Sequence, residues 1–359
     1  MRSPGEGVHV AVVGYGYWGS KHVRVLCSMP SVAVTVVDEH TGRLAEALSR
    51  HPGIRVAEHV HDVLDDVDAV VVATPPGSHA AVALAALDAG CHVLVEKPLT
   101  TTVPDAETLV DRARRADVRL MVGNTFEYNP AVARLREIVR SGVLGRILYI
   151  DTARLSLGRY QSDVNVVWDL APHDISIVSY LLDEMPAATA VWAQRNIGRR
   201  HADIAYLRLS FERSRTQAFV HVSWLDPNKV RRVTVVGDRK MAVYNDLSDT
   251  ERIRIYDAGV DSTTLDGSPE AHAMPVTYRT GDITSLAVPY SEPLLVQDQH
   301  FLSCVRTGET PRTPGSRGLD IVRVLATADD MGGSWPMVSG GFVPAPIAPG
   351  SATTPVAAS

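Results

Sequence analysis

The sequence has little cysteine, no long apolar run and no excess of positive charge. Its three cysteines lie far apart and form no CxxC pair; they are Cys27, Cys91 and Cys304. The sequence therefore predicts neither a disulfide framework nor a zinc site, and we expect no bound metal. The longest apolar runs, such as residues 69–76, are far shorter than a membrane span, and the first residues lack the apolar core of a signal peptide. These absences predict a cytoplasmic protein that does not enter a membrane.

The balance of charged and apolar residues is that of an ordinary globular protein. The chain has 359 residues, of which 45% are hydrophobic and 21% are charged, and its formal net charge is −6. A protein that binds nucleic acid usually presents a basic face, so this balance argues against a nucleic-acid partner. The length is sufficient for two domains with cores of their own.

Strands and helices alternate through the first part of the chain. Short apolar runs typical of buried strands occupy residues 8–13, 32–38, 68–74, 91–98 and 119–125. Helical patterns separate them, and this alternation predicts a parallel sheet with helices on both faces. The sequence thus predicts a doubly wound α/β domain over residues 1–124.

The second part of the chain has strands in near succession, joined by short polar turns. This arrangement indicates a second α/β domain over residues 125–338, built on a large, open, mostly antiparallel sheet. Apolar strand faces that stay open predict a homo-oligomer that forms through this sheet. Residues 339–359 are of low complexity and are expected to form a disordered tail.

A glycine-rich turn follows the first strand and opens a helix. The stretch GYGYWG fits G-x-G-x-x-G; it comprises Gly14, Tyr15, Gly16, Tyr17, Trp18 and Gly19. Asp38 ends the second strand, so the context is that of a Rossmann dinucleotide-binding fingerprint. The turn would hold a pyrophosphate, while Asp38 would bind the ribose hydroxyls and repel a 2′-phosphate, which predicts NAD rather than NADP. Tyr15 and Trp18 are expected either to cover the mouth of this site or to pack.

Further candidates for cofactor contact follow the later strands, at the carboxyl edge where such sheets bind ligands. They are Thr74, Pro75, His79, Glu96, Lys97 and Asn124. His79 fits equally well as a helix-start residue with local hydrogen bonds. Pro98 restricts Lys97 to an extended backbone and could aim its side chain into the crevice, where it would help to move a proton. A strand-end lysine in solvent, paired with Glu96, is the alternative.

The stretch WDLAPHDISI places an acid and a histidine one helical turn apart. If a helix begins here, Asp169 is its N-cap and Pro172 lies in the first turn, which would present Asp169 and His173 side by side. Asp174 fits a favourable charge near the helix N-terminus. Taken alone, the pattern is more typical of a plain cap and a core histidine.

Several motifs together resemble the Gfo/Idh/MocA oxidoreductase family. They are GYGYWG, the acidic end of the second strand, TPPGSH, EKP, GNTFEYNP, SGVLGRI and the D-x-x-x-H of WDLAPHDI, in the family's order and approximate spacing. The resemblance covers nearly the whole chain except the tail. It implies an enzyme that uses NAD(P) to oxidise or reduce a sugar or polyol carbon, with Lys97, Asp169 and His173 near the reacting carbinol. Many members have glycine where this chain has Ala171, which leaves the orientation of the His173 ring open.

Two regions also resemble nucleotide-sugar dehydrogenases that oxidise C3 of UDP-linked hexoses, amino sugars or uronic acids. These regions surround WDLAPHDI and VSWLDPNKVRRVTVVGD. With this chemistry His173 would be the base, oriented by Asp169, and Lys97 would polarise the hydroxyl or relay its proton; the roles of Lys97 and His173 can also be exchanged.

Substrate contacts are expected from two polar segments. Sugar hydroxyls would meet Arg159, Tyr160, Gln161, Asn165 and Trp168, with Asn165 the first choice because an amide both donates and accepts hydrogen bonds. A diphosphate would meet the basic residues Lys229, Arg231 and Arg232. A solvated charge run at the start of a strand is the alternative for this basic cluster.

The sequence therefore predicts an NAD-dependent oxidoreductase that converts C3 of a nucleotide-linked sugar, such as UDP-glucose or UDP-N-acetylglucosamine, to a ketone. We expect a biosynthetic role, such as antibiotic biosynthesis, with a pathway aminotransferase as a partner. The alternatives are a sugar ketoreductase working in the reverse direction, an NAD-dependent redox glycosidase and a non-catalytic NAD-binding regulator.

Overall fold

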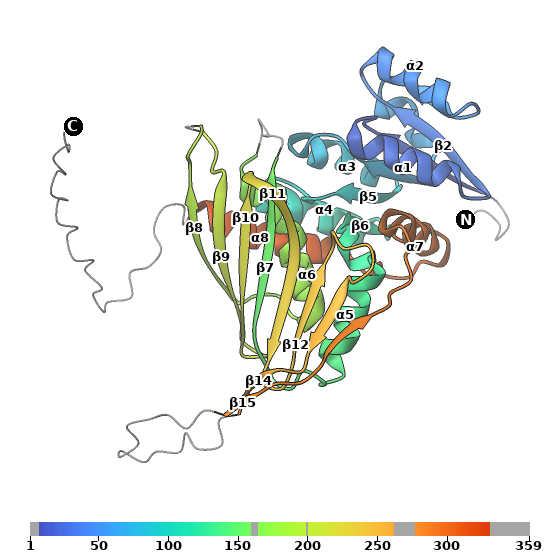
Figure 1. Ribbon diagram of the computed structural model, residues 1–359. Coiled ribbons are helices and arrows are strands. Elements are labelled where there is room, and N and C mark those ends of the chain that lie inside the picture. The colour runs from blue at the N-terminus through green and yellow to red at the C-terminus, as the bar shows by residue number, and fades with distance from the viewer. Residues whose placement is uncertain (1–6, 159–163, 199, 262–276, 331–359) are drawn as a thin grey trace, which may run out of the picture.

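Two large β-sheets with their covering helices make up most of the described part of the protein, as a computed structural model shows (Figure 1). The structure describes residues 7–158, 164–198, 200–261 and 277–330. The first sheet is parallel and the second is mixed, so the predicted combination of a doubly wound domain and a domain with a large open sheet is confirmed.

The first sheet has six parallel strands in the order β3-β2-β1-β4-β5-β6. Its strands are β1 (Val8–Val13), β2 (Val32–Val37), β3 (Arg55–Ala57), β4 (Ala69–Val72), β5 (His92–Glu96) and β6 (Leu120–Gly123). Strands β1, β4, β5 and β6 are almost fully buried, as expected for a sheet with helices on both faces. The edge strand β3 was not predicted, because three residues are too few to show a pattern. The strand order reverses between β1 and β4, where doubly wound sheets bind ligands.

Helices connect these strands and cover the sheet. They are α1 (Tyr17–Cys27), α2 (Thr41–Arg50), α3 (His79–Asp88) and α4 (Val103–Arg115). Short 3-10 turns lie at η1 (Val60–Asp62), η2 (Leu64–Asp66), η3 (Pro76–Ser78) and η4 (Thr125–Tyr128). Local chemistry fixes some boundaries: α4 begins where the Thr102 side chain accepts the N–H of Asp105, with Pro104 in the first turn.

The second sheet has eight strands in the order β16-β13-β12-β11-β7-β10-β9-β8. They are β7 (Ile147–Leu157), β8 (Ala188–Gln194), β9 (Ile204–Phe211), β10 (Thr216–Ser223), β11 (Leu225–Gly237), β12 (Met241–Asn245), β13 (Ile253–Tyr256) and β16 (Ile283–Leu286). Only the β7–β10 pair of this sheet is parallel, which confirms the mostly antiparallel prediction. A separate two-stranded ribbon joins β14 (Gly259–Asp261) and β15 (Thr277–Arg279).

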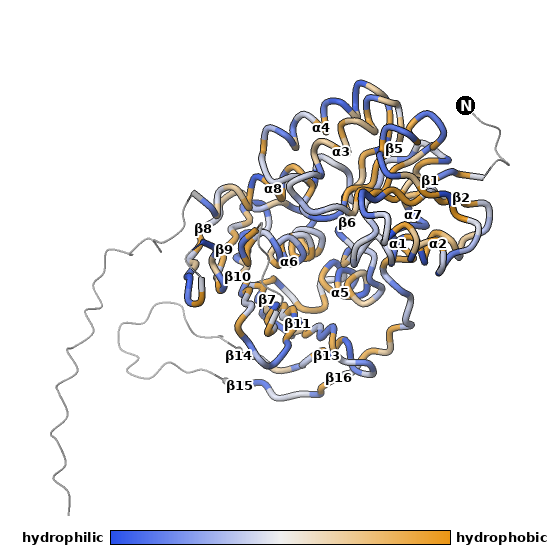
Figure 2. Tube along the Cα trace, turned by 90° about the horizontal axis from the view of Figure 1, so that it is seen from above, coloured by the Kyte–Doolittle hydropathy of each residue, from blue (hydrophilic) through white to orange (hydrophobic). Residues whose placement is uncertain are grey.

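Helices cover one face of the second sheet. The helices α5 (Pro130–Arg140) and α6 (Val166–Leu182) pack on β12, β7 and β10, and among the described residues no helix lies on the opposite face (Figure 2). Strand β9 shows the consequence, because its alternate residues are buried toward the helices while Tyr206 and Arg208 stay exposed.

The last two helices return to the first sheet. The helix α7 (Pro293–Thr307) packs on α1 and η4, and α8 (Gly315–Asp330) packs on α4, α6 and β6. Thr313, just before α8, accepts the backbone N–H of Val122 of β6 with its carbonyl oxygen, and its hydroxyl group donates to the Val122 carbonyl oxygen. These returns hold α6 against the carboxyl edge of the first sheet.

Candidate active site

The glycine-rich turn between β1 and α1 has the shape of a dinucleotide site. Gly14 has a φ of +93°, and a Cβ there would lie 2.8 Å from the carbonyl oxygen of Ala73. A Cβ on Gly19 would lie 1.7 Å from the Gly14 carbonyl oxygen, so α1 can pack on the turn only through glycine. A Cβ on Gly16, in contrast, would meet nothing within 4 Å. The turn is therefore open at Gly16, where a pyrophosphate would approach.

The start of α1 suits an anion. Its N-cap, Gly16, offers no side-chain hydrogen bond to the first turn, and that turn carries no acidic residue. The N–H groups of the first turn are thus available to a phosphate, which the helix dipole also favours.

Asp38, at the end of β2, is fixed against this turn. Its carboxylate accepts the N–H of Tyr15 at 2.7 Å and that of His40 at 2.9 Å, and it is 7% exposed. Arg43 forms an ion pair with it at 3.3 Å, a contact that the sequence analysis did not consider. The carboxylate is held beside the turn, as binding of the ribose requires.

The aromatic residues of the turn have different surroundings. The Tyr15 ring is 4% exposed and belongs to the core, so only its backbone N–H serves this site. Tyr17 is 70% exposed and contacts the Trp18 ring edge to face, at 5.5 Å between ring centroids. The Lys21 ammonium lies 4.6 Å from the centroid of the Tyr17 ring. Packing is therefore the role of Tyr15, while Tyr17 and Trp18 flank the turn.

Beside the turn, His79 braces the carboxyl edge of the sheet. Its Nδ1 lies 2.8 Å from the carbonyl oxygen of Pro98 and its Nε2 lies 2.9 Å from that of Thr74. Burial lowers the pKa of His79, while the hydrogen bonds to the Pro98 and Thr74 carbonyl oxygens oppose this change. The ring thus joins the ends of β4 and β5 rather than facing a ligand, whereas Pro75 is exposed at this edge.

Glu96 and Lys97 point to opposite sides of the end of β5. The Glu96 carboxylate is buried, where it contacts His22 and accepts the N–H of Lys97 at 3.2 Å. It therefore lies beneath the site rather than in its wall. The Lys97 ammonium donates to the backbone carbonyl of Asp169 at 2.7 Å and lies 3.3 Å from the Asp169 carboxylate. This contact brings together residues 72 positions apart.

The helix α6, which supplies Asp169, begins earlier than the sequence analysis expected. Its N-cap is Asn165, whose side-chain oxygen accepts the N–H groups of Val167 and Trp168. The prediction that Asp169 caps this helix is therefore wrong, and Pro172 lies inside the helix instead of in its first turn. Proline lacks an N–H group and disturbs the helical turn that precedes it. The carbonyl oxygen of Asp169, in that turn, accepts a hydrogen bond from the Lys97 ammonium. The indole N–H of Trp224 binds the other carboxylate oxygen of Asp169, at 3.1 Å.

His173 lies one turn further along α6. Its Nδ1 is buried and has no hydrogen-bond partner among the described residues. The ring meets Phe126 edge to face, at 5.1 Å between centroids. Burial, followed by the positive charges of Lys97, Arg154 and Arg231, holds the pKa of His173 well below its usual value. The imidazole is therefore neutral at pH 7 and can accept a proton.

Each of the cations around His173 belongs to an ion pair. Arg154 binds the Asp174 carboxylate at 2.7 Å, with both side chains buried, and Arg231 binds Asp246 at 3.3 Å. Asp174 is thus not a helix N-terminal charge, as the sequence analysis suggested, but the buried partner of a strand arginine. Arg154 was not among the predicted site residues, although its charge in the middle of the strand β7 was a usable signal.

Among the described residues, the buried side-chain atoms without a hydrogen-bond partner include Nδ2 of Asn124, which follows β6, and Nδ1 of His173. Buried polar atoms nearly always have partners, so these two atoms indicate the place of a bound molecule. Together with the open turn at Gly16, they fit an NAD molecule that extends from α1 toward Lys97.

The residues that were predicted to bind the substrate differ in their surroundings. Asn165 caps α6 and also donates to Asp329, while the Trp168 indole N–H donates to the same carboxylate, so both side chains tie α6 to α8 instead of facing a sugar. Residues 159–161, which are Arg159, Tyr160 and Gln161, lie outside the described residues.

The basic cluster on β11 is divided between the two faces of the sheet. Arg231 lies opposite Arg154 of β7, and its charge lowers the pKa of His173. Arg232 points to the other face, where its charge opposes the rise in the pKa of Asp151 that burial causes. Lys229 is exposed just before Val230, where β11 resumes its pairing with β7 after an irregularity. Only Arg231 is thereby placed beside the catalytic candidates.

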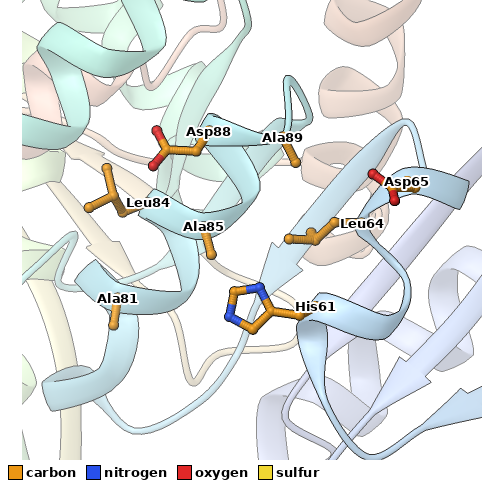
Figure 3. Close-up of a pocket in the computed structure, with 8 residues that line it drawn as sticks. All are labelled: His61, Leu64, Asp65, Ala81, Leu84, Ala85, Asp88 and Ala89. Carbon is orange, nitrogen blue, oxygen red and sulfur yellow. The ribbon is translucent and has the colours of Figure 1, made fainter.

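A separate groove of about 580 Å³ lies on the first domain (Figure 3). It lies between α3 and the η1–η2 segment and includes His61, Asp65 and Asp88. None of its lining residues belongs to the glycine-rich turn or to α6. The chemistry described above therefore lies elsewhere, at the carboxyl edge.

The chain is similar to dehydrogenases of known activity. UDP-N-acetylglucosamine 3-dehydrogenase of Acidithiobacillus ferrooxidans is 28% identical over 264 residues, which cover 73% of this chain and 80% of that enzyme. Inositol 2-dehydrogenase of Rhodococcus erythropolis is 33% identical over 189 residues, which cover 51% of this chain and 55% of that enzyme. The solved structure of the Acidithiobacillus enzyme, GnnA, shares the fold with a TM-score of 0.75 at 23% identity, covering 90% of this chain and 97% of that one.

Within the ranges that the structure describes, no helix is both long enough and apolar enough to span a bilayer.

Two family models match the sequence. "Oxidoreductase family, NAD-binding Rossmann fold" matches residues 8–124, and "GFO/IDH/MocA C-terminal domain" matches residues 132–243. The two matches together cover more than half of the chain and confirm the prediction of an NAD-binding Rossmann domain. The chain belongs to the Gfo/Idh/MocA family of NAD-binding oxidoreductases.

Proposed function

We propose that the protein is an NAD-dependent dehydrogenase that oxidises C3 of a nucleotide-linked sugar, such as UDP-N-acetylglucosamine or UDP-glucose, to the 3-keto sugar. The observation that carries the proposal is a neutral, unpaired His173 ring nitrogen near the Lys97–Asp169 ion pair. A site that only sensed NAD would not need a proton acceptor and a polarising cation together.

Oxidation of a secondary alcohol requires the removal of a proton and a hydride. NAD, when bound, supplies the acceptor for the hydride. In the proposed reaction His173 takes the hydroxyl proton, because its imidazole is neutral at pH 7. The Lys97 ammonium, held by Asp169, stabilises the negative charge that develops on the substrate oxygen. Asp169 therefore serves to hold Lys97 and not to orient the His173 ring.

The choice of a nucleotide sugar rests on the 28% identical UDP-N-acetylglucosamine 3-dehydrogenase and on Arg231. Arg231 is partly exposed and adjoins the reacting centre, where a guanidinium could bind a phosphate or carboxylate of the substrate. The NAD preference rests on Asp38, whose fixed carboxylate would repel a 2′-phosphate.

An inositol or another free polyol is the second candidate substrate, because inositol 2-dehydrogenases are among the relatives. The same residues would also serve a ketoreductase in the reverse direction or a redox glycosidase.

The proposal further includes a homo-oligomer that forms through the helix-free face of the second sheet, a cytoplasmic location and a biosynthetic pathway that contains an aminotransferase. Exposed aromatic and apolar residues on that face, among them Tyr149 and Phe219, support the oligomer.

The test follows absorbance at 340 nm in the presence of NAD and one member of a panel. The panel contains UDP-glucose, UDP-N-acetylglucosamine, their dTDP analogues and myo-inositol. Formation of NADH with a UDP sugar, together with a 3-keto product in the mass spectrum, would support the proposal. NADH formation with myo-inositol alone would replace the substrate assignment, and release of reducing sugar would indicate the glycosidase.

A further inference from the structure

A buried histidine lies between two buried carboxylates beneath Lys97. The Nε2 of His22 lies 3.1 Å from the Glu96 carboxylate, and its Nδ1 lies 3.0 Å from that of Asp298. All three side chains are almost fully buried. They come from α1, β5 and α7, so the contact joins the helix of the glycine-rich turn to the last part of the chain.

The surroundings keep a proton on His22. Burial alone would lower the pKa of His22, but the Asp298 and Glu96 carboxylates raise it to about 10. The ring is therefore an imidazolium near pH 7 and donates from both nitrogens. This donation leaves little freedom for the Glu96 carboxylate, one oxygen of which is taken by His22.

The other oxygen of Glu96 accepts the backbone N–H of Lys97. Gly123 of β6 packs directly against this carboxylate, since a Cβ there would lie 3.1 Å from it. On the far side of Lys97, the His79 ring contacts the carbonyl oxygen of Pro98. The backbone around Lys97 is thus held from two sides, by Glu96 and by His79. Only the contact with Glu96 depends on charged groups, namely the Glu96 carboxylate and the His22 imidazolium.

We propose that His22 and Asp298 are positioning residues for Lys97: they fix the Glu96 carboxylate, which in turn fixes the backbone from which the Lys97 ammonium reaches Asp169. The proposal extends the proposed function, because it assumes that Lys97 acts on the substrate. It also gives α7 a role in catalysis, since Asp298 brings that helix to the site. A buried ion network is seldom the most stable way to fill such a space, so a functional reason for keeping one is expected.

The test uses the four lysines of the chain, which are Lys21, Lys97, Lys229 and Lys240. Lysine labelled with ¹³C at Cε gives a short list of NMR signals, and Lys97→Arg assigns the signal of Lys97. The His22→Gln protein keeps a donor to Glu96 but loses the charge and one of the two contacts. We expect the Lys97 signal to shift or broaden in His22→Gln while the Lys229 and Lys240 signals stay in place.

The matched control is His9→Gln. His9 also contacts partners with both ring nitrogens, Asp66 and Thr35, but at the amino end of β1. Its substitution should leave the Lys97 signal unchanged. A folded His22→Gln protein with an unshifted Lys97 signal would overturn the proposal. Because this readout needs no substrate, it remains valid if no tested sugar is oxidised.

Turnover gives the second readout when a substrate has been found. We expect His22→Gln to lower kcat about tenfold and to change KM for NAD by less than about threefold, since the turn at Gly16 is not altered. If His22→Gln does not fold, Asp298→Asn takes its place: the amide oxygen keeps an acceptor for His22, and we expect a smaller shift of the same Lys97 signal. Equal losses in kcat and in NAD affinity, with the Lys97 signal unmoved, would show a merely structural role.

Discussion

The two histidines on either side of Lys97 have opposite charge states. His22, beneath the lysine, lies between two carboxylates that raise its pKa to about 10. His173, in front of it, is surrounded by three cations and has a pKa well below the usual value. Both rings are largely removed from water, which by itself disfavours the imidazolium, so the neighbouring charges account for the difference.

This difference indicates a division of labour around one lysine. A histidine that keeps its proton is a fixed donor and can hold a neighbouring carboxylate in place. A histidine that has lost its proton is an acceptor and can take one from a substrate. The comparison predicts that loss of His173 removes chemistry, whereas loss of His22 makes Lys97 less well ordered.

The largest effect is expected for His173→Asn. Loss of the proton acceptor should lower kcat by about 10²–10⁴-fold, which is the usual contribution of a general base. The Kd for NAD, measured by quenching of tryptophan fluorescence, should stay within about threefold. His9→Gln serves as the control and should retain normal turnover. A His173→Asn enzyme with near-normal kcat would refute the assignment of the base.

The next effect in size concerns Asp38→Ala. Loss of the hydrogen bonds from the carboxylate to the ribose should weaken NAD binding by about tenfold to a hundredfold, and NADP should lose less. Titration calorimetry with both cofactors measures this change. The Asp38→Ala variant also sharpens the comparison of the two histidines. It should leave unchanged the dependence on pH that His22 gives to the free energy of unfolding. Unaltered NAD affinity would remove Asp38 from the cofactor site.

A smaller effect concerns stability against pH. The folded-state pKa of His22 lies near 10, above the value of about 6.5 for an unfolded histidine, so folding favours the bound proton. Its stabilising contribution is complete below pH 6.5 and is lost as the pH rises toward 10, with a slope of at most about 1.4 kcal/mol per pH unit. Urea unfolding at several pH values should show this slope in the native protein and a flatter curve in His22→Gln. Parallel curves for the two proteins would contradict the charge state of His22.

The smallest effect concerns the acid side of the activity profile. Because the pKa of His173 is lowered, kcat/KM should stay level as the pH falls to 6.5 and decrease only below that value. Arg231→Gln removes one of the cations that lower this pKa, so its acid limb should move upward by less than about one pH unit. Arg232→Gln, on the opposite face of the same strand, is the matched control and should leave the limb in place. Equal shifts in both variants would mean that no specific contact is involved.

Features that depend on neighbouring residues could be predicted from the sequence. The strand–turn–helix around Gly14 follows from hydrophobic periodicity and from the close approach that only glycine permits, and the fold followed from the alternation of strands and helices. Lys97, Asp169 and His173 were selected by the resemblance of several motifs, and the structure places Lys97 in contact with Asp169.

Features that depend on long-range contacts could not be predicted. The contact of His22 with Asp298 joins residues 276 positions apart, and no local pattern indicates that pairing. Asn165 looked like a sugar-binding amide, but only the packing of α6 on α8 shows that both ends of its side chain are used. The split of Arg231 and Arg232 follows from strand alternation once the strand is known to extend through both residues.

The most direct test of the central claim follows the hydride itself. UDP-N-acetylglucosamine that carries deuterium at C3 is incubated with the enzyme and NAD, and the reduced cofactor is analysed by mass spectrometry. The account predicts NADH that has gained one deuterium, together with an unlabelled 3-keto sugar, and almost none of either from His173→Asn. Reduced cofactor without deuterium, or no reduction although both NAD and the sugar are shown to bind, would contradict it.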